Sequence, residues 1–432
     1  IAGKGKRVLF LVPSLALIAQ TVREWTKDSE ITLRSFAVCS DAQVGKRRAN
    51  TADIAEIEAH ELDFPATTNP SKLIERAAID DAERMTVVFS TYQSTPVITA
   101  AQEQGLQAFD LIICDEAHRT TGAKIDGEED SNFIRVHENK YVNGVKRLYM
   151  TATPRIYGEN ARTKAAEASV ELCDMDDETL YGPTFFTRGF SWAVENGWLS
   201  DYKVIVLAMD ESVVSRGVQG RLAADNELKL DDATKIIGCY KALMKQGSED
   251  EFSVDANPMR RAIAFCKDIR SSKLISNEFS AVVNEFNTAD LLAANSAKPI
   301  SCTTKHVDGT FNAKTRGELL HWLGDDVAEN ECKILSNARC LSEGVDVPAL
   351  DAILFLHPRK SQIDVVQSVG RVMRKADGKN LGYVILPVVI PADTAPEDAL
   401  DDNERYRVVW QILNALRSHD DRFDATINKL EL

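Results

Sequence analysis

The sequence predicts an α/β protein with two successive domains, each built on a mostly parallel sheet. Short apolar runs rich in β-branched residues recur along the chain, and stretches with helical spacing of apolar residues separate them. Small polar or acidic residues directly follow several of these runs. Such runs are typical of strands buried on both faces, which belong to parallel sheets. At 432 residues the chain is long enough for two or more domains.

Composition narrows the class of protein. With 44% hydrophobic and 27% charged residues, the chain has the composition of an ordinary globular protein. The net charge of −15 argues against broad electrostatic adhesion to nucleic acid, although a basic groove within an acidic protein stays open. The eight cysteines lack C-x-x-C spacing, so we expect reduced thiols in a cytoplasmic protein and no zinc site.

The ends and apolar runs give further expectations. The longest apolar run, near Val8 to Ile18, is broken by Pro13 and Ser14 and is too short to span a bilayer, so we expect no membrane partner. No charged-then-apolar leader follows Ile1, so we expect no signal peptide. The missing initiator Met suggests that the chain is part of a longer protein.

The first domain is expected to alternate strands and helices. Arg7–Val12 reads as a strand, and apolar residues at helical spacing predict a helix from Leu15 to Trp25. A second unit of this kind is predicted at 35–38 and near 52–62, whereas the polar stretch 124–140 has no clear period. Further strands are predicted at 86–90, 110–114 and 146–150, and the apolar run 204–207 is expected to close this domain.

Four of these strands end in hydroxyl or acidic residues, namely Pro13/Ser14, Ser90/Thr91, Asp115/Glu116 and Thr151/Thr153. In a doubly wound parallel sheet the carboxyl ends of the strands share one edge, where ligands bind. Each hydroxyl alone could equally be a helix cap or a turn residue. The four together favour an edge at which a nucleotide and a polymer are handled.

Asp115 and Glu116 carry the chemistry expected at this edge. Asp115 could hold a hydrated Mg²⁺, and Glu116 could polarise an attacking water molecule, also contacting the metal through that water. The alternative is a solvated turn that happens to be acidic.

The second domain is expected to begin with a strand at Arg261–Cys266, after a helix near 230–244 and an acidic linker at 246–257. The predicted elements that follow are a helix around 274–286, strands at 333–336, 352–356 and 384–389, and an amphipathic helix near 406–416. A helix carrying Gln367, Gly370, Arg371 and Arg374 would place both arginines on one face and allow close approach of another backbone at the glycine. The alternative is a solvated helix with two arginines.

Four segments in this order resemble the motor core of superfamily 2 helicases and translocases: D-E-A-H at 115–118, T-A-T at 151–153, S-E-G-V-D-V-P at 342–348 and Q-x-x-G-R-x-x-R at 367–374. The resemblance covers roughly residues 7 to 390. Within the superfamily, the segments D-E-A-H-R-T-T-G and T-A-T-P-R and the run Ala193–Val206 are most similar to the single-polypeptide Type I, or Type ISP, restriction–modification enzymes.

The resemblance implies two RecA-like lobes with helices on both faces of each sheet. The implied regions are an N-terminal lobe at 1–208, a helical linker at 209–260, a C-terminal lobe at 261–391 and a short helical tail at 392–432. The implied function is an ATP-dependent translocase on double-stranded DNA that hydrolyses ATP with Mg²⁺ at the cleft between lobes. Nuclease, methyltransferase and target-recognition domains would lie elsewhere in the same polypeptide. The alternatives are a non-catalytic DNA-binding or scaffold module, or a strand-separating DNA or RNA helicase.

The resemblance also implies residue roles. Asp115 would coordinate Mg²⁺, Glu116 would activate water, and His118 would link the nucleotide state to the second lobe. The other implied nucleotide-site residues are Thr151 and Thr153, which would also couple hydrolysis to DNA, Gly344 and Asp346 at the cleft, and Gln367, Arg371 and Arg374 facing the triphosphate. The implied contacts with the DNA backbone are Ser14, Gln20, Thr91 and Ser342. Phe190, Trp192 and Trp198 are expected in the core and not on a platform for single-stranded bases.

One element of the family is missing from the sequence. A phosphate-binding loop follows a strand and ends in G-K-[ST], whereas Lys4-Gly5-Lys6 precedes a strand and no Ser or Thr follows either lysine. We expect this loop upstream of Ile1, and we expect the 432-residue chain alone to be largely inactive.

Overall fold

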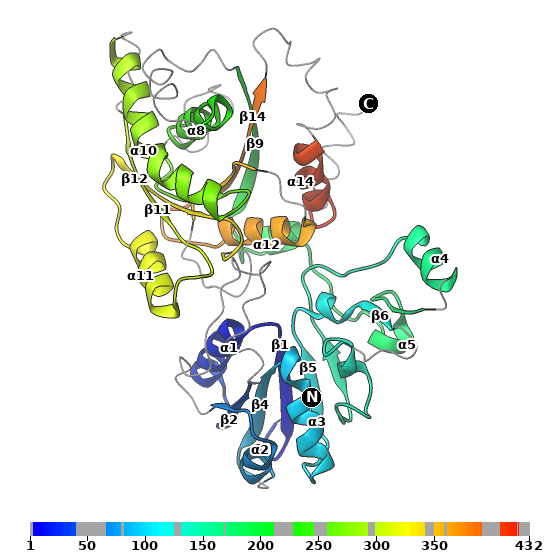
Figure 1. Ribbon diagram of the computed structural model, residues 1–432. Helices are drawn as coiled ribbons and strands as arrows, with labels where there is room; N and C mark the ends of the chain where they lie inside the picture. Colours follow the sequence, from blue (N-terminus) through cyan, green and yellow to red (C-terminus); the bar gives the residue numbers. More distant parts are fainter. Residues whose placement is uncertain are drawn as a thin grey trace. The chain divides into compact units, whose positions relative to one another are not determined.

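The computed structural model describes residues 3–39, 66–78, 82–124, 131–167, 170–210, 228–245, 257–292, 299–341, 350–357, 361–390, 407–420 and 422. The chain forms two compact units (Figure 1). The first comprises Ile1–Ala49 and Glu56–Phe186, and the second comprises Asn50–Ala55 and Thr187–Leu432. No helix among the described residues is long and apolar enough to cross a membrane.

The first unit contains a six-stranded sheet in the order β3-β2-β4-β1-β5-β7. All of its paired strands are parallel. The strands are β1 Arg7–Val12, β2 Leu33–Val38, β3 Ala66–Thr67, β4 Met85–Thr91, β5 Leu111–Cys114 and β7 Arg147–Tyr149. The strands expected at 7–12, 35–38, 86–90, 110–114 and 146–150 are therefore present in this sheet, whereas the run at 204–207 is not part of it. The helix expected near 52–62 lies outside the described residues.

Helices cover both faces of this sheet (Figure 1). On one face, α1 (Leu15–Asp28) contributes Ile18 to the apolar cluster that contains Phe10 of β1. On the other, α2 (Pro70–Ala77) and α3 (Thr95–Glu103) contribute buried side chains to the cluster that contains Leu9 and Leu11 of β1. Successive residues of β1 thus point to opposite cores, as a fully buried strand requires.

A small annex belongs to the same unit. The strands β6 (Gly122–Lys124) and β8 (Glu171–Cys173) form an antiparallel pair, accompanied by α4 (Glu159–Glu167) and α5 (Glu178–Tyr181). Short 3₁₀ helices are found at Tyr92–Ser94, Ala117–Thr120 and Arg135–His137. The last of these lies in the stretch for which the sequence showed no period.

The second unit contains a second sheet of six strands in the order β11-β12-β10-β13-β14-β9, again with parallel pairs throughout. The strands are β9 Asp201–Asp210, β10 Arg261–Phe265, β11 Ser301–His306, β12 Glu331–Asn337, β13 Ala352–Phe355 and β14 Leu381–Ile390. The fold class, two mostly parallel sheets of the RecA-like kind, is confirmed. Strand β11 was not predicted, because its S-C-T-T-K-H sequence is largely polar.

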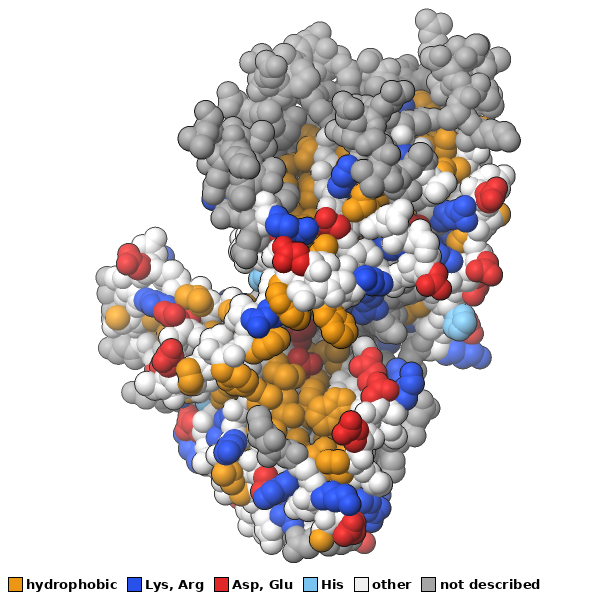
Figure 2. Space-filling view, turned by 180° about the vertical axis from the view of Figure 1, so that it is seen from behind, with side chains coloured by type: hydrophobic (Ala, Val, Ile, Leu, Met, Phe, Trp, Pro, Cys, Tyr) orange, Lys and Arg blue, Asp and Glu red, His pale blue; other side chains and the backbone are white. Residues whose placement is uncertain are grey.

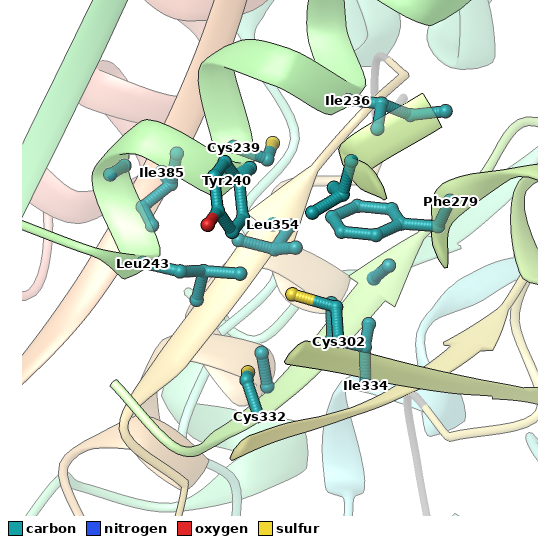
Figure 3. Packing of buried hydrophobic residues seen from close by; sticks show 14 of the residues in the cluster. Ile236, Cys239, Tyr240, Leu243, Phe279, Cys302, Cys332, Ile334, Leu354 and Ile385 are labelled. Atoms are coloured by element: carbon teal, nitrogen blue, oxygen red, sulfur yellow. The ribbon is translucent and has the colours of Figure 1, made fainter. Parts of the chain in front are cut away.

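The helices of the second unit also lie on both faces of the sheet. On one face, α8 (Leu230–Leu243) and α10 (Ile269–Leu292) build a core in which Tyr240 and Leu243 point from α8 towards Leu354 of β13 (Figure 3). The helices α12 (Gln362–Val372) and α14 (Arg407–Arg417) contribute to the core on the other face. The remaining helices are α6 (Phe190–Glu195) and α11 (Ala313–Gly324).

The structure differs from the expected region boundaries. Strand β9 pairs along its whole length with β14, so it belongs to the second sheet and does not close the first. Its apolar sequence indicated a buried strand correctly but held no information about the partner. Helix α8 was expected to be part of a linker, but its Ile236 and Tyr240 lie in the core of the second unit. Helix α14 was expected in a tail, but its Ile412 lies in the core of the same unit.

The expectation for the aromatic residues near 190–198 was partly wrong. Phe190 packs against the core of the second unit, as expected. Trp192 is 38% exposed and Trp198 is 71% exposed, so neither lies in the core. The guanidinium carbon of Arg188 lies 5.2 Å from the centre of the Trp192 ring.

Candidate active site

Four neighbouring strands of the first sheet, β4, β1, β5 and β7, end at the same edge. In their registers, Leu11 is opposite both Ser90 and Cys114, and Cys114 is opposite Tyr149. Because the pairs are parallel, the residues that follow these strands emerge side by side. The predicted alignment of four polar strand ends is therefore present in the structure.

The backbone turns sharply between the two carboxylates. Asp115 still donates its N–H to the carbonyl of Leu11 (2.9 Å), whereas Glu116 adopts a left-handed conformation with φ 50° and ψ 45°. This conformation is uncommon for a residue other than glycine. The N–H of Glu116 donates to Oδ1 of Asp115 (2.9 Å), and the N–H of Ala117 donates to the carbonyl of Met150 (2.9 Å). The turn therefore fixes both carboxylates at the end of β5.

The electrostatics of the pair favour a bound cation. Burial and the neighbouring charge of Glu116 raise the pKa of Asp115 to about 6. A divalent cation would offset both effects by favouring the ionised carboxylate. Among the described residues there is no cluster of three or more His, Cys, Asp or Glu side chains that could cage a metal. The donor set instead fits Mg²⁺, which is bound through one or two carboxylates together with water and substrate phosphates.

His118 joins this turn to the segment after β7. Its buried imidazole places Nδ1 3.0 Å from Oγ1 of Thr151 and 3.4 Å from Oγ1 of Thr153. The same nitrogen lies 3.3 Å from Oε2 of Glu116. The N–H of Thr153 donates to Oγ1 of Thr151 (3.1 Å), so the two threonines form one unit. The structure thus brings Asp115, Glu116, His118, Thr151 and Thr153 together.

A second histidine supports this arrangement and was not anticipated. His137 has its Nε2 3.0 Å from the carbonyl oxygen of Thr120 and its Nδ1 2.8 Å from the hydroxyl of Tyr149. Burial lowers the pKa of His137 to about 4, so the ring is neutral near pH 7. Since a carbonyl only accepts, Nε2 donates to Thr120 and Nδ1 accepts from Tyr149. His137 therefore links the segment after Glu116 to the last residue of β7.

The side chains expected to contact DNA in the first unit all make hydrogen bonds within the protein, and they differ in exposure. The Oγ of Ser14 accepts from the N–H of Leu17 (3.4 Å) and caps α1, and the amide of Gln20 donates to Glu24 (2.9 Å). Thr91 is fully buried, and its hydroxyl lies 2.8 Å from that of Ser94. Ser14 and Gln20 are partly exposed, whereas Thr91 would have to exchange its internal partner to reach a phosphate.

In the second unit, α12 carries Gln367 and Arg371 but ends at Val372. Arg374 follows in a tighter turn, in which its N–H donates to the carbonyl of Arg371 (3.3 Å). The helix therefore stops two residues before Arg374, the last residue expected on it. A Cβ at Gly370 would meet only the ring of Phe190, at 3.9 Å, so the close backbone approach expected there is not present. Ser342, Gly344 and Asp346 lie outside the described residues.

The sequence of this chain matches known protein families and relatives. Residues 1–156 match the family model described as "Type III restriction enzyme, res subunit", and residues 250–376 match "Helicase conserved C-terminal domain". "Probable helicase A859L" of African swine fever virus (isolate Tick/South Africa/Pretoriuskop Pr4/1996) is 27% identical over 417 residues, 96% of this chain and 39% of that protein. The chain therefore spans about two fifths of this relative.

Two solved structures are similar over 99% of the chain. The ATP-dependent Type ISP restriction–modification enzyme LlaBIII bound to DNA is 44% identical with a TM-score of 0.80, and the chain covers 27% of it. A nuclease-deletion mutant of the Type ISP enzyme LlaGI in complex with a DNA substrate mimic is 37% identical with a TM-score of 0.61, and the chain covers 26% of it.

The fold and the ordered site segments define a helicase-like motor of superfamily 2. In particular, the chain is similar to the Type ISP restriction–modification enzymes LlaBIII and LlaGI, of each of which it spans about a quarter. Both levels of the resemblance seen in the sequence are confirmed.

Proposed function

We propose that this chain is the motor of an ATP-dependent translocase that moves along double-stranded DNA, within a restriction–modification enzyme. The observation that carries the proposal is the contact of His118 with both Glu116 and Thr151. This contact joins the carboxylate pair at the end of β5 to the segment that follows β7, the neighbouring strand in the sheet. Hydrolysis can drive movement only if the hydrolytic site is coupled to other parts of the protein, and this contact is a candidate for such a link.

The proposal assigns one role to each residue of the nucleotide site. Asp115 holds Mg²⁺, and the metal, when bound, neutralises charge on the phosphates. Glu116 orients the attacking water and accepts its proton. His118 links the state of the nucleotide to the second lobe, and Thr151 and Thr153 couple hydrolysis to the DNA. Gln367, Arg371 and Arg374 stabilise charge on the phosphates from the second lobe, with Gly344 and Asp346 beside them.

DNA is proposed to be held through its backbone, by Ser14, Gln20, Thr91 and Ser342. Acidic and basic side chains are interspersed on the face shown in Figure 2, without a continuous basic stripe on its described surface. Contacts made by hydroxyl and amide groups to phosphates carry no sequence information, which suits a motor that passes over any sequence. The nuclease, methyltransferase and target-recognition activities are proposed to lie in other parts of the same polypeptide.

Two observations favour other functions. The sequence contains no G-K-[ST] segment, which is what a non-catalytic DNA-binding or scaffold module would show. The exposed rings of Trp192 and Trp198 could stack on unpaired bases, which a strand-separating helicase would require.

A comparison of two DNA substrates tests the proposal. The full-length protein with ATP should displace a triplex-forming strand far from its loading site and should release little single strand from a forked duplex of equal length. The Glu116→Gln variant is the matched control, because it retains the shape of the side chain without the carboxylate. Efficient unwinding of the fork without triplex displacement would indicate a helicase instead. Activity in neither assay would indicate the non-catalytic module.

A further inference from the structure

The turn that follows α12 contains a lysine directed at the end of that helix. Nζ of Lys379 donates to the carbonyl oxygens of Val372 (2.5 Å) and Arg374 (2.9 Å). The last carbonyls of a helix have no partner within the helix, and a cation near them is favourable. Burial lowers the pKa of Lys379 to about 8, against the opposing effect of Asp351, so the side chain is still an ammonium at pH 7.

A glycine in β14 meets the same helix end. A Cβ built on Gly382 would overlap the carbonyl oxygen of Val372, so only glycine allows this approach without displacing the helix. The close backbone approach expected at Gly370 is therefore made here. The carbonyl oxygen of Val372 therefore lies close to both the Lys379 ammonium and the backbone of β14 at Gly382.

Met373, the residue between Val372 and Arg374, also accepts a hydrogen bond from outside the helix. The N–H of Ser200, next to the first residue of β9, donates to the carbonyl oxygen of Met373 (2.7 Å). Three consecutive carbonyl groups, 372 to 374, therefore each accept a hydrogen bond from outside the helix. Arg371 immediately precedes these residues and Arg374 is the last of them.

We propose that Lys379 is a positioning residue that sets the direction of Arg371 and Arg374 by anchoring the last turn of α12. Among the described residues, both hydrogen bonds of the Lys379 Nζ go to backbone carbonyls, so its proposed effect on the reaction passes through the arginines beside those carbonyls. The inference rests on the proposed function, in which the two arginines stabilise charge on the nucleotide.

The test uses the full-length protein and steady-state ATP hydrolysis with saturating DNA. Lys379→Met keeps the aliphatic stem and removes the cation, and we expect kcat to fall at least tenfold while KM for ATP stays within about twofold. Lys379→Arg keeps a cation that can donate to both carbonyls, and it should recover most of the rate. Lys375→Met, in the same turn and exposed, is the matched control and should leave kcat unchanged.

Two further measurements separate positioning from folding and from failure of the proposed function. Thermal unfolding of Lys379→Met should stay within a few degrees of the parent, because a loss of kcat caused by unfolding would overturn the inference. In a protein that already carries Arg371→Ala, adding Lys379→Met should lower kcat less than about twofold further. The reason is that Lys379 is proposed to affect kcat by positioning the arginines. Full multiplication of the two losses would overturn the inference. If Arg371→Ala itself left kcat unchanged, the role of the arginines in the proposed function would fail first.

Discussion

Nδ1 of His118 lies 3.0 Å from the Oγ1 of Thr151, and this contact joins two segments that are far apart in the sequence. We expect Thr151→Val, which removes the hydroxyl at nearly constant shape, to lower the stimulation of ATP hydrolysis by DNA about tenfold. Hydrolysis without DNA should change little, because the carboxylates remain in place. The measurement is the ratio of the two rates in the full-length protein. An unchanged ratio would contradict a coupling role for this contact.

Glu116 is expected to be needed for chemistry and not for binding. Glu116→Gln should reduce kcat about 10²- to 10⁴-fold, the range typical of a lost general base. Binding of a fluorescent ATP analogue with Mg²⁺ should stay within a few fold, because Asp115 is unaltered. Asp115→Asn serves as the comparison, since it should weaken Mg²⁺-dependent binding as well. Equal losses of binding in both variants would argue against separate roles.

Arg371 and Arg374 are expected to act on charge that develops during the reaction. Arg371→Ala or Arg374→Ala should cut kcat about 10³-fold or more while nucleotide binding falls far less. The assay requires the full-length protein with a G-K-[ST] segment. If either variant kept kcat within about threefold of the parent, the placement of these arginines at the nucleotide would be wrong.

The chain of 432 residues by itself should hydrolyse ATP barely above background, with or without DNA. Without a phosphate-binding loop, the β- and γ-phosphates lack the cradle of backbone N–H groups and the lysine that hold them in related motors. A phosphate-release assay on the purified chain checks this. Robust DNA-stimulated turnover would show that another part of the chain binds the phosphates.

His137 should make stability depend on pH. Its pKa is about 4 when folded and near 6.5 when unfolded, so below pH 6.5 the unfolded state binds more protons and stability is lost as pH falls towards 4. The full effect is about 3 kcal/mol. Asp115, whose pKa is raised to about 6, has the opposite sign, because its ionisation destabilises the folded state as pH rises.

Because these two effects oppose each other, the diagnostic quantity is the difference between variants. Urea unfolding between pH 4 and 7 should show that His137→Gln, which can still donate and accept, loses less stability on acidification than the parent. Parallel curves for parent and variant would mean that His137 does not titrate as the geometry indicates.

The sequence predicted those parts of the site that lie directly after a strand. Asp115, Glu116, Thr151 and Thr153 could be identified because an apolar run marks each strand and a parallel sheet brings the strand ends together. His137 and Lys379 could not be identified in this way. His137 ends a short 3₁₀ helix in a stretch without clear period, and Lys379 lies in a polar turn. Their partners, Thr120 and Tyr149 for His137 and the end of α12 for Lys379, depend on tertiary packing.

The sequence also could not show which sheet each strand joins, because that depends on tertiary packing. The apolar run near Val204 predicted a strand, and the strand exists, but its neighbour in the sheet is β14 and not a strand of the first unit. Apolar sequence indicates burial on both faces and is silent about which edge a strand joins.

The pairing of β9 with β14 bears on the order in which the protein folds during synthesis. Strand β9 is the first strand of the second sheet to leave the ribosome, and its partner β14 is the last. All six strands of the first sheet precede both. Domains generally fold in order of synthesis, so the first unit can fold while β9 is still an unpaired apolar segment. The second unit has to keep that segment out of wrong pairings until nearly all of its own chain has been made.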